Sequence, residues 1–143
     1  MEVLPADLCI TRLNRQAERL GVEIRTLERK PSETVVGYYV AKPGEPGHIE
    51  LHTHSSTPAK QRCQLLTHEM VHVLQHWHAD WKSVLPLGWP TNGPATQERR
   101  LSPHEAEAFT AQDQPRKVLQ ALKQLAPVPA NASPPSNATP SSN

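Results

Sequence analysis

Apolar residues near the start of the chain recur at the spacing of an amphipathic helix. Leu8, Leu13, Ala17 and Leu20 follow this spacing, and Gly21 comes directly after them. Glycine is a common stop signal because the chain can leave the helical conformation there at little steric cost. The pattern therefore predicts a first helix that ends close to Gly21.

The next three segments have the composition and alternation of β-strands. VEIRTLE (22–28) and ETVVGYYVA (33–41) are rich in β-branched and aromatic residues, and HIELHTH (48–54) alternates apolar with polar side chains. The sequence Lys-Pro-Gly-Glu-Pro-Gly (42–47) separates the second and third segments and is typical of a turn. We therefore expect three strands, the third with one face toward water.

Two helical regions follow, separated by a segment rich in proline and glycine. The first should begin after Pro58, which is a natural helix start, and run through about residue 77. The irregular segment covers residues 79–97. The last helix should begin after Ser102, whose hydroxyl can cap it, and Pro115 can interrupt it before it resumes. Together these elements predict an α+β domain.

Length, charge and the distribution of apolar residues limit the classes of function. The 143 residues suffice for one domain, and the net charge is +1 with scattered Lys and Arg, so no nucleic-acid partner is expected. No apolar run approaches the length of a membrane span, and the N-terminus lacks the features of a secretory signal. We therefore expect a cytoplasmic protein without membrane association, in which Cys9 and Cys63 are reduced, partly buried thiols.

The end of the chain differs in composition from the rest. From Pro127 onward it reads PVPANASPPSNATPSSN, which carries no charge and almost no large apolar side chain. Such a segment cannot bury enough apolar surface to offset the entropy lost on ordering. We therefore expect one domain over residues 1–126 and a disordered tail, rich in Pro, Ser and Asn, over residues 127–143.

The stretch THEMVHVLQHWH (67–78) carries the strongest chemical signal. His68, Glu69 and His72 form an H-E-x-x-H motif, and residues four apart lie on one face of a helix, so both imidazoles can reach one ion. Glu69 can hold a water molecule without binding the ion itself. The neighbouring positions are mostly apolar, so the helix should be deeply buried. Burying two histidines and a glutamate is costly unless a divalent metal satisfies them.

Two imidazoles do not complete a catalytic zinc site, which usually has three protein ligands. His76 fails on geometry, because it lies about 12 Å from His68 along a straight helix. His78 follows His72 at the spacing found in metzincins. That arrangement normally needs a glycine where this chain has Gln75, and the downstream methionine turn of metzincins is absent. His78 therefore stays an alternative rather than the preferred ligand.

The segment SPHEAEAF (102–109) offers two carboxylates, Glu105 and Glu107. With it, the sequence resembles a minimal gluzincin-type metallopeptidase domain, in which THEMVH is the metal helix and PHEAEAF presents a glutamate ligand from a second helix. The portion from Glu105 to Gln112 is also similar to the glutamate helix of small bacterial peptidases that cleave phage repressors and stress regulators, and the resemblance as a whole covers roughly residues 47–112. The Glu-x-x-Ala spacing of the family matches Glu105, whereas a different register would select Glu107.

The resemblance implies a zincin-like α+β fold, in which a small twisted three-stranded sheet packs on the buried metal-binding helix. One zinc ion would be held by His68, His72 and Glu105, and Glu69 would act as the general base when water attacks a peptide carbonyl. The partner would be a peptide or protein substrate. It could pair with an edge strand formed by GHIELHTH (47–54).

Two questions stay open at the level of sequence. Tyr38, Tyr39, His104 and Arg99 are all possible donors to the tetrahedral oxyanion, and the sequence does not rank them. The protein could also be a catalytically inactive zincin-fold binding or regulatory module with a structural metal. Glu69 argues against that alternative, because a structural site needs no general base.

Overall fold

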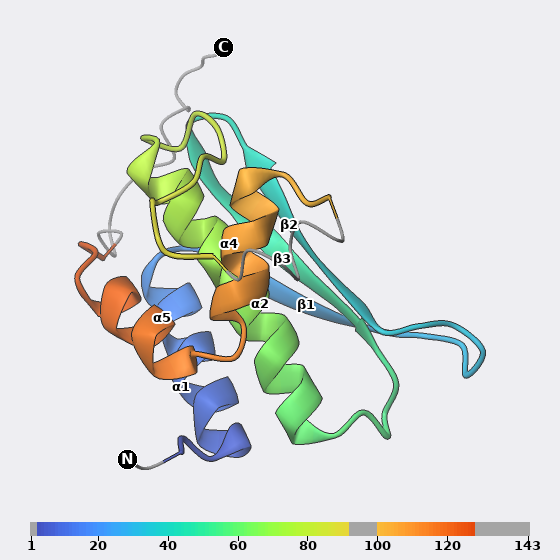
Figure 1. Cartoon of the computed structure of the whole chain (residues 1–143). Coiled ribbons are helices and arrows are strands. Elements are labelled where there is room, and N and C mark those ends of the chain that lie inside the picture. The colour runs from blue at the N-terminus through green and yellow to red at the C-terminus, as the bar shows by residue number, and fades with distance from the viewer. Residues whose placement is uncertain (1–2, 92–99, 128–143) are drawn as a thin grey trace.

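The computed structural model describes residues 3–91 and 100–127 of the chain. In chain order the elements are α1 (Ala6–Arg19), β1 (Glu23–Glu28), β2 (Val36–Lys42), β3 (Glu45–Thr53), α2 (Ala59–His78), α4 (Pro103–Ala111) and α5 (Pro115–Lys123). Figure 1 shows their arrangement. The predicted α+β class with three strands is confirmed.

The three strands form one mixed sheet in the order β1-β3-β2. β1 pairs with β3 in parallel, and β2 pairs with the other side of β3 in antiparallel orientation. β3 is therefore the central strand, and the prediction that residues 47–54 form an edge strand is wrong. The alternation of that segment identifies which face each side chain occupies, but not which strands lie beside it.

The two faces of β3 have different surroundings, as the alternation predicted. Ile49 and Leu51 are buried in the hydrophobic core. Glu50 points to the opposite face, where its two oxygens lie 2.8 Å from Nε2 of His48 and 3.0 Å from Nε2 of His52. These hydrogen bonds lower the pKa of the Glu50 carboxyl. The second face of the sheet is thus polar along its central strand.

α2 is the centre of the fold. It contacts α1, α4, α5, β2 and β3, and Figure 1 shows it between the sheet and α4. Its fully buried apolar side chains are Leu66, Met70, Val71, Val73 and Leu74. Each such side chain stabilises the fold by about 1.5–3 kcal/mol relative to an exposed one. The prediction of a deeply buried helix is confirmed.

Cys9 and Cys63 form a disulfide bond between α1 and α2. Their Cα atoms are 5.9 Å apart, although the residues are separated by 54 positions in the sequence. The expectation of two reduced thiols is therefore wrong. The direct packing of α1 on α2 brings the two side chains together, and the spacing of two cysteines carries no information about such a tertiary contact.

The helix ends agree with the sequence in part. Gly21 follows α1 with φ at 76°, a conformation that glycine adopts without steric strain. The last helical region is interrupted after Ala111 and resumes at Pro115, which begins α5, so the predicted interruption near Pro115 is confirmed. Ser102 precedes α4, but its side chain makes no hydrogen bond to the helix backbone. Its Oγ lies 3.2 Å from Nδ1 of His104 instead, so the predicted side-chain cap is wrong.

Arg19 attaches the end of α5 to α1. Its Nη2 donates hydrogen bonds to the carbonyl oxygens of Leu122 and Leu125, at 3.0 and 3.1 Å. The carbonyl of Leu122 also accepts the N–H of Leu125, so Arg19 adds a charged donor at the C-terminal end of α5. The predicted tail, residues 127–143, lies outside the described residues except for Pro127.

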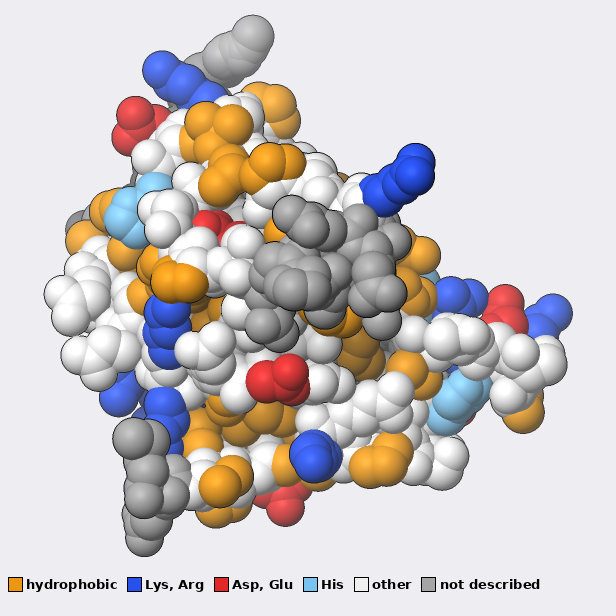
Figure 2. Space-filling view, in the orientation of Figure 1, with side chains coloured by type: hydrophobic (Ala, Val, Ile, Leu, Met, Phe, Trp, Pro, Cys, Tyr) orange, Lys and Arg blue, Asp and Glu red, His pale blue; other side chains and the backbone are white. Residues whose placement is uncertain are grey.

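The face of the molecule in Figure 2 carries charged side chains of both signs. Several Lys and Arg side chains lie near the lower left edge of this view and others are scattered, while the hydrophobic side chains form separate patches. Among the residues that the structure describes, no helix combines the length and the apolar character needed to cross a bilayer.

Candidate metal centre

His68, His72 and Glu105 bring their ligand atoms together where α2 meets α4. These atoms, one from each side chain, all lie within 4.8 Å of one another. Oε1 of Glu105 is 3.1 Å from Nε2 of His68 and 3.3 Å from Nε2 of His72. Within residues 3–91 and 100–127, no other group of three or more His, Cys, Asp or Glu side chains is close enough to hold a metal ion.

The local sequence explains how these side chains meet. His68 and His72 are one helical turn apart on α2, and their rings are in edge-to-face contact at a centroid distance of 5.1 Å. Pro103 starts α4, which places Glu105 in the first turn of that helix. Ala108 is fully buried, and its small side chain lets α4 pack closely against α2.

A glutamine holds each of the two histidines by its other ring nitrogen. Nδ1 of His68 lies 2.9 Å from Oε1 of Gln112, and Nδ1 of His72 lies 2.7 Å from Oε1 of Gln75. An amide oxygen can only accept a hydrogen bond, so both Nδ1 atoms act as donors. Nε2 is then the nitrogen left to bind an ion on each ring.

Glu105 and His68 influence each other's protonation. The hydrogen bonds from His68 and His72 lower the pKa of the Glu105 carboxyl well below its usual range, although partial burial opposes this. Burial by itself acts to lower the pKa of His68. The hydrogen bond to Glu105, the charge of Glu69 and the hydrogen bond to Gln112 outweigh burial, and the pKa of His68 is raised. A carboxylate that stays charged beside two imidazoles is suited to hold a cation.

Glu69 lies next to the ligand group without belonging to it. Its carboxylate lies against β2, because a Cβ built on Gly37 would be only 3.0 Å from Oε2 of Glu69. The side chain is buried, and burial raises the pKa of its carboxyl, although the charges of His68 and His72 oppose this effect. A raised pKa makes this carboxylate a better proton acceptor than an exposed glutamate.

Glu107, the other candidate for the third ligand, is engaged elsewhere. It is 2% exposed, and its two oxygens accept hydrogen bonds from the successive backbone N–H groups of residues 87–89, at 2.7, 2.8 and 2.8 Å. Nε2 of Gln75 donates a further bond at 2.9 Å. The structure therefore places Glu105, and not Glu107, beside the two histidines.

His76 and His78 both lie outside the ligand group. His76 is buried, with Nδ1 2.6 Å from the hydroxyl of Tyr39 and Nε2 2.8 Å from the carbonyl oxygen of Trp81. Burial lowers the pKa of His76, although its bond to Trp81 opposes this. Burial also raises the pKa of Tyr39 to about 12, against the effect of the Gly47 N–H. His78 is exposed at the end of α2.

The structure describes three of the four candidates for the oxyanion donor, and they lie in different places. The ring of His104 contacts the ring of His72 at a centroid distance of 5.7 Å. Tyr38 lies on the face of the sheet that carries the polar side chains of β3. The hydroxyl of Tyr39 is already bonded in the interior. Arg99 lies outside the described residues. Of the three described candidates, His104 is thus the one in contact with the cluster.

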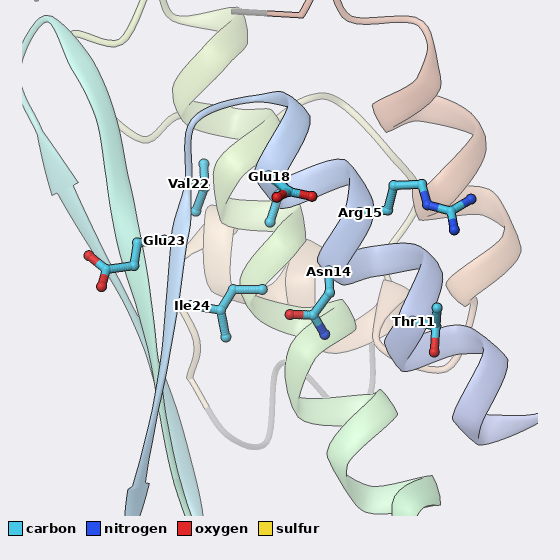
Figure 3. Close-up of a pocket in the computed structure, with 8 residues that line it drawn as sticks. Thr11, Asn14, Arg15, Glu18, Val22, Glu23 and Ile24 are labelled. Atoms are coloured by element: carbon cyan, nitrogen blue, oxygen red, sulfur yellow. The ribbon is translucent and has the colours of Figure 1, made fainter. Parts of the chain in front are cut away.

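A groove of about 490 Å³ lies elsewhere, between α1 and β1 (Figure 3). Asn14, Glu18 and Ile24 are among its lining residues. Arg15 also borders it, although Figure 3 shows its side chain pointing away from β1. None of the three clustered ligand residues lines this groove, so it is a separate part of the surface.

No protein-family model, no curated protein and no solved structure matches this chain. The candidate centre therefore has to be understood from its own residues and geometry. Gln75, Gln112 and Gly37 were not identified from the sequence, although each contacts one of the residues of the centre. Gln75 alone had a local signal, because it follows His72 by three positions on the same helix, which places the two side chains side by side.

Proposed function

We propose that the protein is a zinc-dependent metallopeptidase with a zincin-like fold. The observation that carries the proposal is the convergence of His68, His72 and Glu105 from two helices, next to the buried Glu69. Two histidines and a glutamate form the ligand set of several catalytic zinc sites that keep a fourth position open. The resemblance of both motifs to gluzincins supports the same assignment.

The residues that are present suit zinc by their chemistry. The cluster offers two imidazole nitrogens and one carboxylate oxygen, which zinc accepts in tetrahedral sites. Gln112 and Gln75 each place an amide oxygen where the second ring nitrogen of a metal-bound imidazole usually meets a carboxylate, a backbone carbonyl or water. When bound, the ion would supply a Lewis acid that polarises a peptide carbonyl and makes water more acidic.

The protein's own residues would move the protons. Glu69 would take a proton from the attacking water and pass it to the leaving amine. Its burial and raised pKa support this role. His104, whose ring contacts that of His72, is the described side chain best placed to donate a hydrogen bond to the oxyanion.

A peptide substrate would bind in extended form along the outer edge of β2. β3 is paired on both sides and cannot serve as the docking strand, whereas β2 is an edge of the sheet. Gly37 of β2 lies against Glu69, so a peptide paired with this strand would pass close to the general base. Main-chain hydrogen bonds at a strand edge provide affinity for many peptide sequences.

Metal analysis tests the ligand assignment. The wild-type protein should bind about one zinc ion per chain, and His68→Ala should lose it, since two remaining ligands bind zinc weakly. His78→Ala is a matched control, because His78 is an exposed histidine on the same helix outside the cluster. Undiminished zinc in His68→Ala would overturn the assignment.

A second variant tests the chemistry separately from metal binding. Glu69→Gln should keep the zinc ion and lose cleavage of unfolded protein substrates by about 10²–10⁴-fold, the usual contribution of a general base. Glu18→Gln, at an exposed position on α1, should change neither property. Retained cleavage in Glu69→Gln would contradict the mechanism. Zinc binding without cleavage of any protein in a panel of unfolded substrates would favour an inactive binding module.

A further inference from the structure

The buried polar groups behind His72 form a connected chain that reaches the segment after α2. Nδ1 of His72 is bonded to Oε1 of Gln75 at 2.7 Å. Nε2 of Gln75 donates to Oε1 of Glu107 and to the carbonyl oxygen of His104, both at 2.9 Å. Gln75 is 0% exposed and Glu107 is 2% exposed, so neither can exchange these partners for water.

The amide of Gln75 has only one orientation that satisfies its neighbours. Its NH₂ group faces two acceptors, the carboxylate of Glu107 and the carbonyl of His104. A reversed amide would place an oxygen against both acceptors and leave them without a donor in the interior, which is costly. Oε1 of Gln75 must therefore face His72. It follows that Nδ1 of His72 carries a proton, which leaves Nε2, 3.3 Å from Oε1 of Glu105, as the nitrogen that can bind an ion.

Glu107 is itself fixed by the backbone of residues 87–89. The N–H of Leu87 is 2.7 Å from its Oε1, and the N–H groups of Gly88 and Trp89 are each 2.8 Å from its Oε2. Gly88 has φ at 94°, and such a left-handed residue turns successive N–H groups toward one anion. Together with Gln75, four donors surround the carboxylate, two at each oxygen.

We propose that Gln75 and Glu107 are positioning residues that set the tautomer and orientation of His72 for metal binding. Glu107 acts through Gln75, and residues 87–89 hold Glu107. The inference rests on the proposed function, because it concerns the same metal site. It adds a coupling between the metal site and residues 87–89, which are not among the proposed metal ligands. Since such coupling is reciprocal, occupation of the metal site would stabilise the conformation of residues 87–89.

Zinc affinity measured in competition with a chromophoric chelator tests the chain of contacts. Gln75→Leu should weaken affinity about 10–100-fold, the usual effect of losing an outer-shell partner. Glu107→Gln should also weaken zinc affinity. An amide at residue 107 can both donate and accept hydrogen bonds, so it would no longer fix the orientation of the Gln75 amide. The double variant should bind zinc no more weakly than Gln75→Leu alone, to within about twofold, because the hydrogen bonds that lead from Glu107 to His72 run through Gln75.

Controls separate this role from a loss of fold. Gln64→Leu changes a glutamine on α2 that is bonded to Asp113 instead, so zinc affinity should stay at the wild-type value. Gly88→Ala strains the segment that holds Glu107 without a clash, because a Cβ at residue 88 meets nothing within 4 Å. If Glu107→Gln fails to fold, Gly88→Ala takes its place in the comparison. Circular dichroism of each metal-free variant establishes that it is folded.

A spectroscopic readout follows the proton directly. In the zinc-loaded wild type, ¹⁵N-histidine NMR should show the proton of His72 on Nδ1, protected from solvent exchange. That protection should fall in folded Gln75→Leu and Glu107→Gln, which a merely structural role would not cause. Wild-type zinc affinity in folded Gln75→Leu, or additive losses in the double variant, would overturn the inference. Absence of zinc binding in the wild type would instead end the proposed function.

Discussion

Gly37 of β2 and Glu69 of α2 are in such close contact that a Cβ at residue 37 would lie 3.0 Å from Oε2 of Glu69. The absence of a side chain at this position lets Glu69, the proposed general base, lie directly against the sheet. Gly37→Ala should therefore displace the carboxylate by a few tenths of an ångström. Because small misplacements of catalytic groups are expensive, we expect cleavage to slow by about tenfold with unchanged zinc content.

The control for Gly37→Ala is Val40→Ala. Val40 lies on the same strand as Gly37, but its side chain is on the other face of the sheet, where its partner on β3 is His48. This control should leave the cleavage rate near that of the wild type. Steady-state kinetics and metal analysis of both variants measure whether the cleavage rate falls while the zinc content stays the same. Equal rates for wild type and Gly37→Ala would mean that Glu69 tolerates displacement or does not act as the base.

Glu105 should contribute more to metal affinity than any residue outside the ligand group. Glu105→Gln replaces a charged oxygen donor by a neutral amide, so zinc affinity should fall by more than the roughly 10–100-fold expected for an outer-shell change. Chelator competition at neutral pH measures this. The assignment of the third ligand would be wrong if Glu105→Gln bound zinc as tightly as Glu18→Gln.

The Cys9–Cys63 disulfide should contribute strongly to stability. It joins residues 54 positions apart, and closing a loop of that length in the unfolded chain is worth about 4 kcal/mol in the chain-entropy model. Urea unfolding with and without a thiol reductant should show this difference in the free energy of unfolding. A Cys9→Ala/Cys63→Ala variant should be as unstable as the reduced protein and indifferent to the reductant. Two titratable thiols in unreduced, denatured protein would contradict the bond.

Stability should fall on mild acidification because His76 resists protonation. Burial lowers its pKa in the folded protein, while the unfolded chain protonates near the ordinary value of 6.5. The contribution of His76 is thus fully present above about pH 6.5 and declines as pH falls toward the lowered pKa, by at most about 1.4 kcal/mol per pH unit.

The groups that face His76 are the Tyr39 hydroxyl and the Trp81 carbonyl. A proton added to Nδ1 would meet the hydroxyl that now donates to it. His76→Gln has no group that titrates in this range, so its free energy of unfolding should vary less between pH 7 and pH 5 than that of the wild type. Parallel curves for the two proteins, measured by urea unfolding of metal-free samples, would exclude His76 as the cause.

The sequence predicted the elements well because each has a periodic pattern of its own. The buried face of α2 follows from the apolar residues around the H-E-x-x-H motif, and the start of α4 follows from Pro103. Residues that belong to one helix, such as His68 and His72, could be related from sequence because the helical repeat fixes their geometry. The position of His68 beside His72 could therefore be predicted from the sequence alone.

Relationships between elements could not be read in this way. The order of the strands put β3 in the centre, although its alternating pattern suits an edge equally well. Glu105 and Glu107 are separated by two positions, about 200° around a helix, so only the rotation of α4 on α2 decides which one faces the histidines. That rotation, like the Cys9–Cys63 contact, depends on packing between distant segments.

The enclosure of α2 has a consequence for how an ion would be recognised. Neighbouring elements surround this helix, and the Cys9–Cys63 bond joins it to α1, so the distance between the two imidazoles is set before any metal arrives. The carboxylate of Glu105 is the most exposed of the three side chains and has the most room to adjust on binding. A preorganised nitrogen pair of this kind loses little conformational entropy when filled, so selectivity among divalent ions would come from rigid spacing rather than from metal-induced folding.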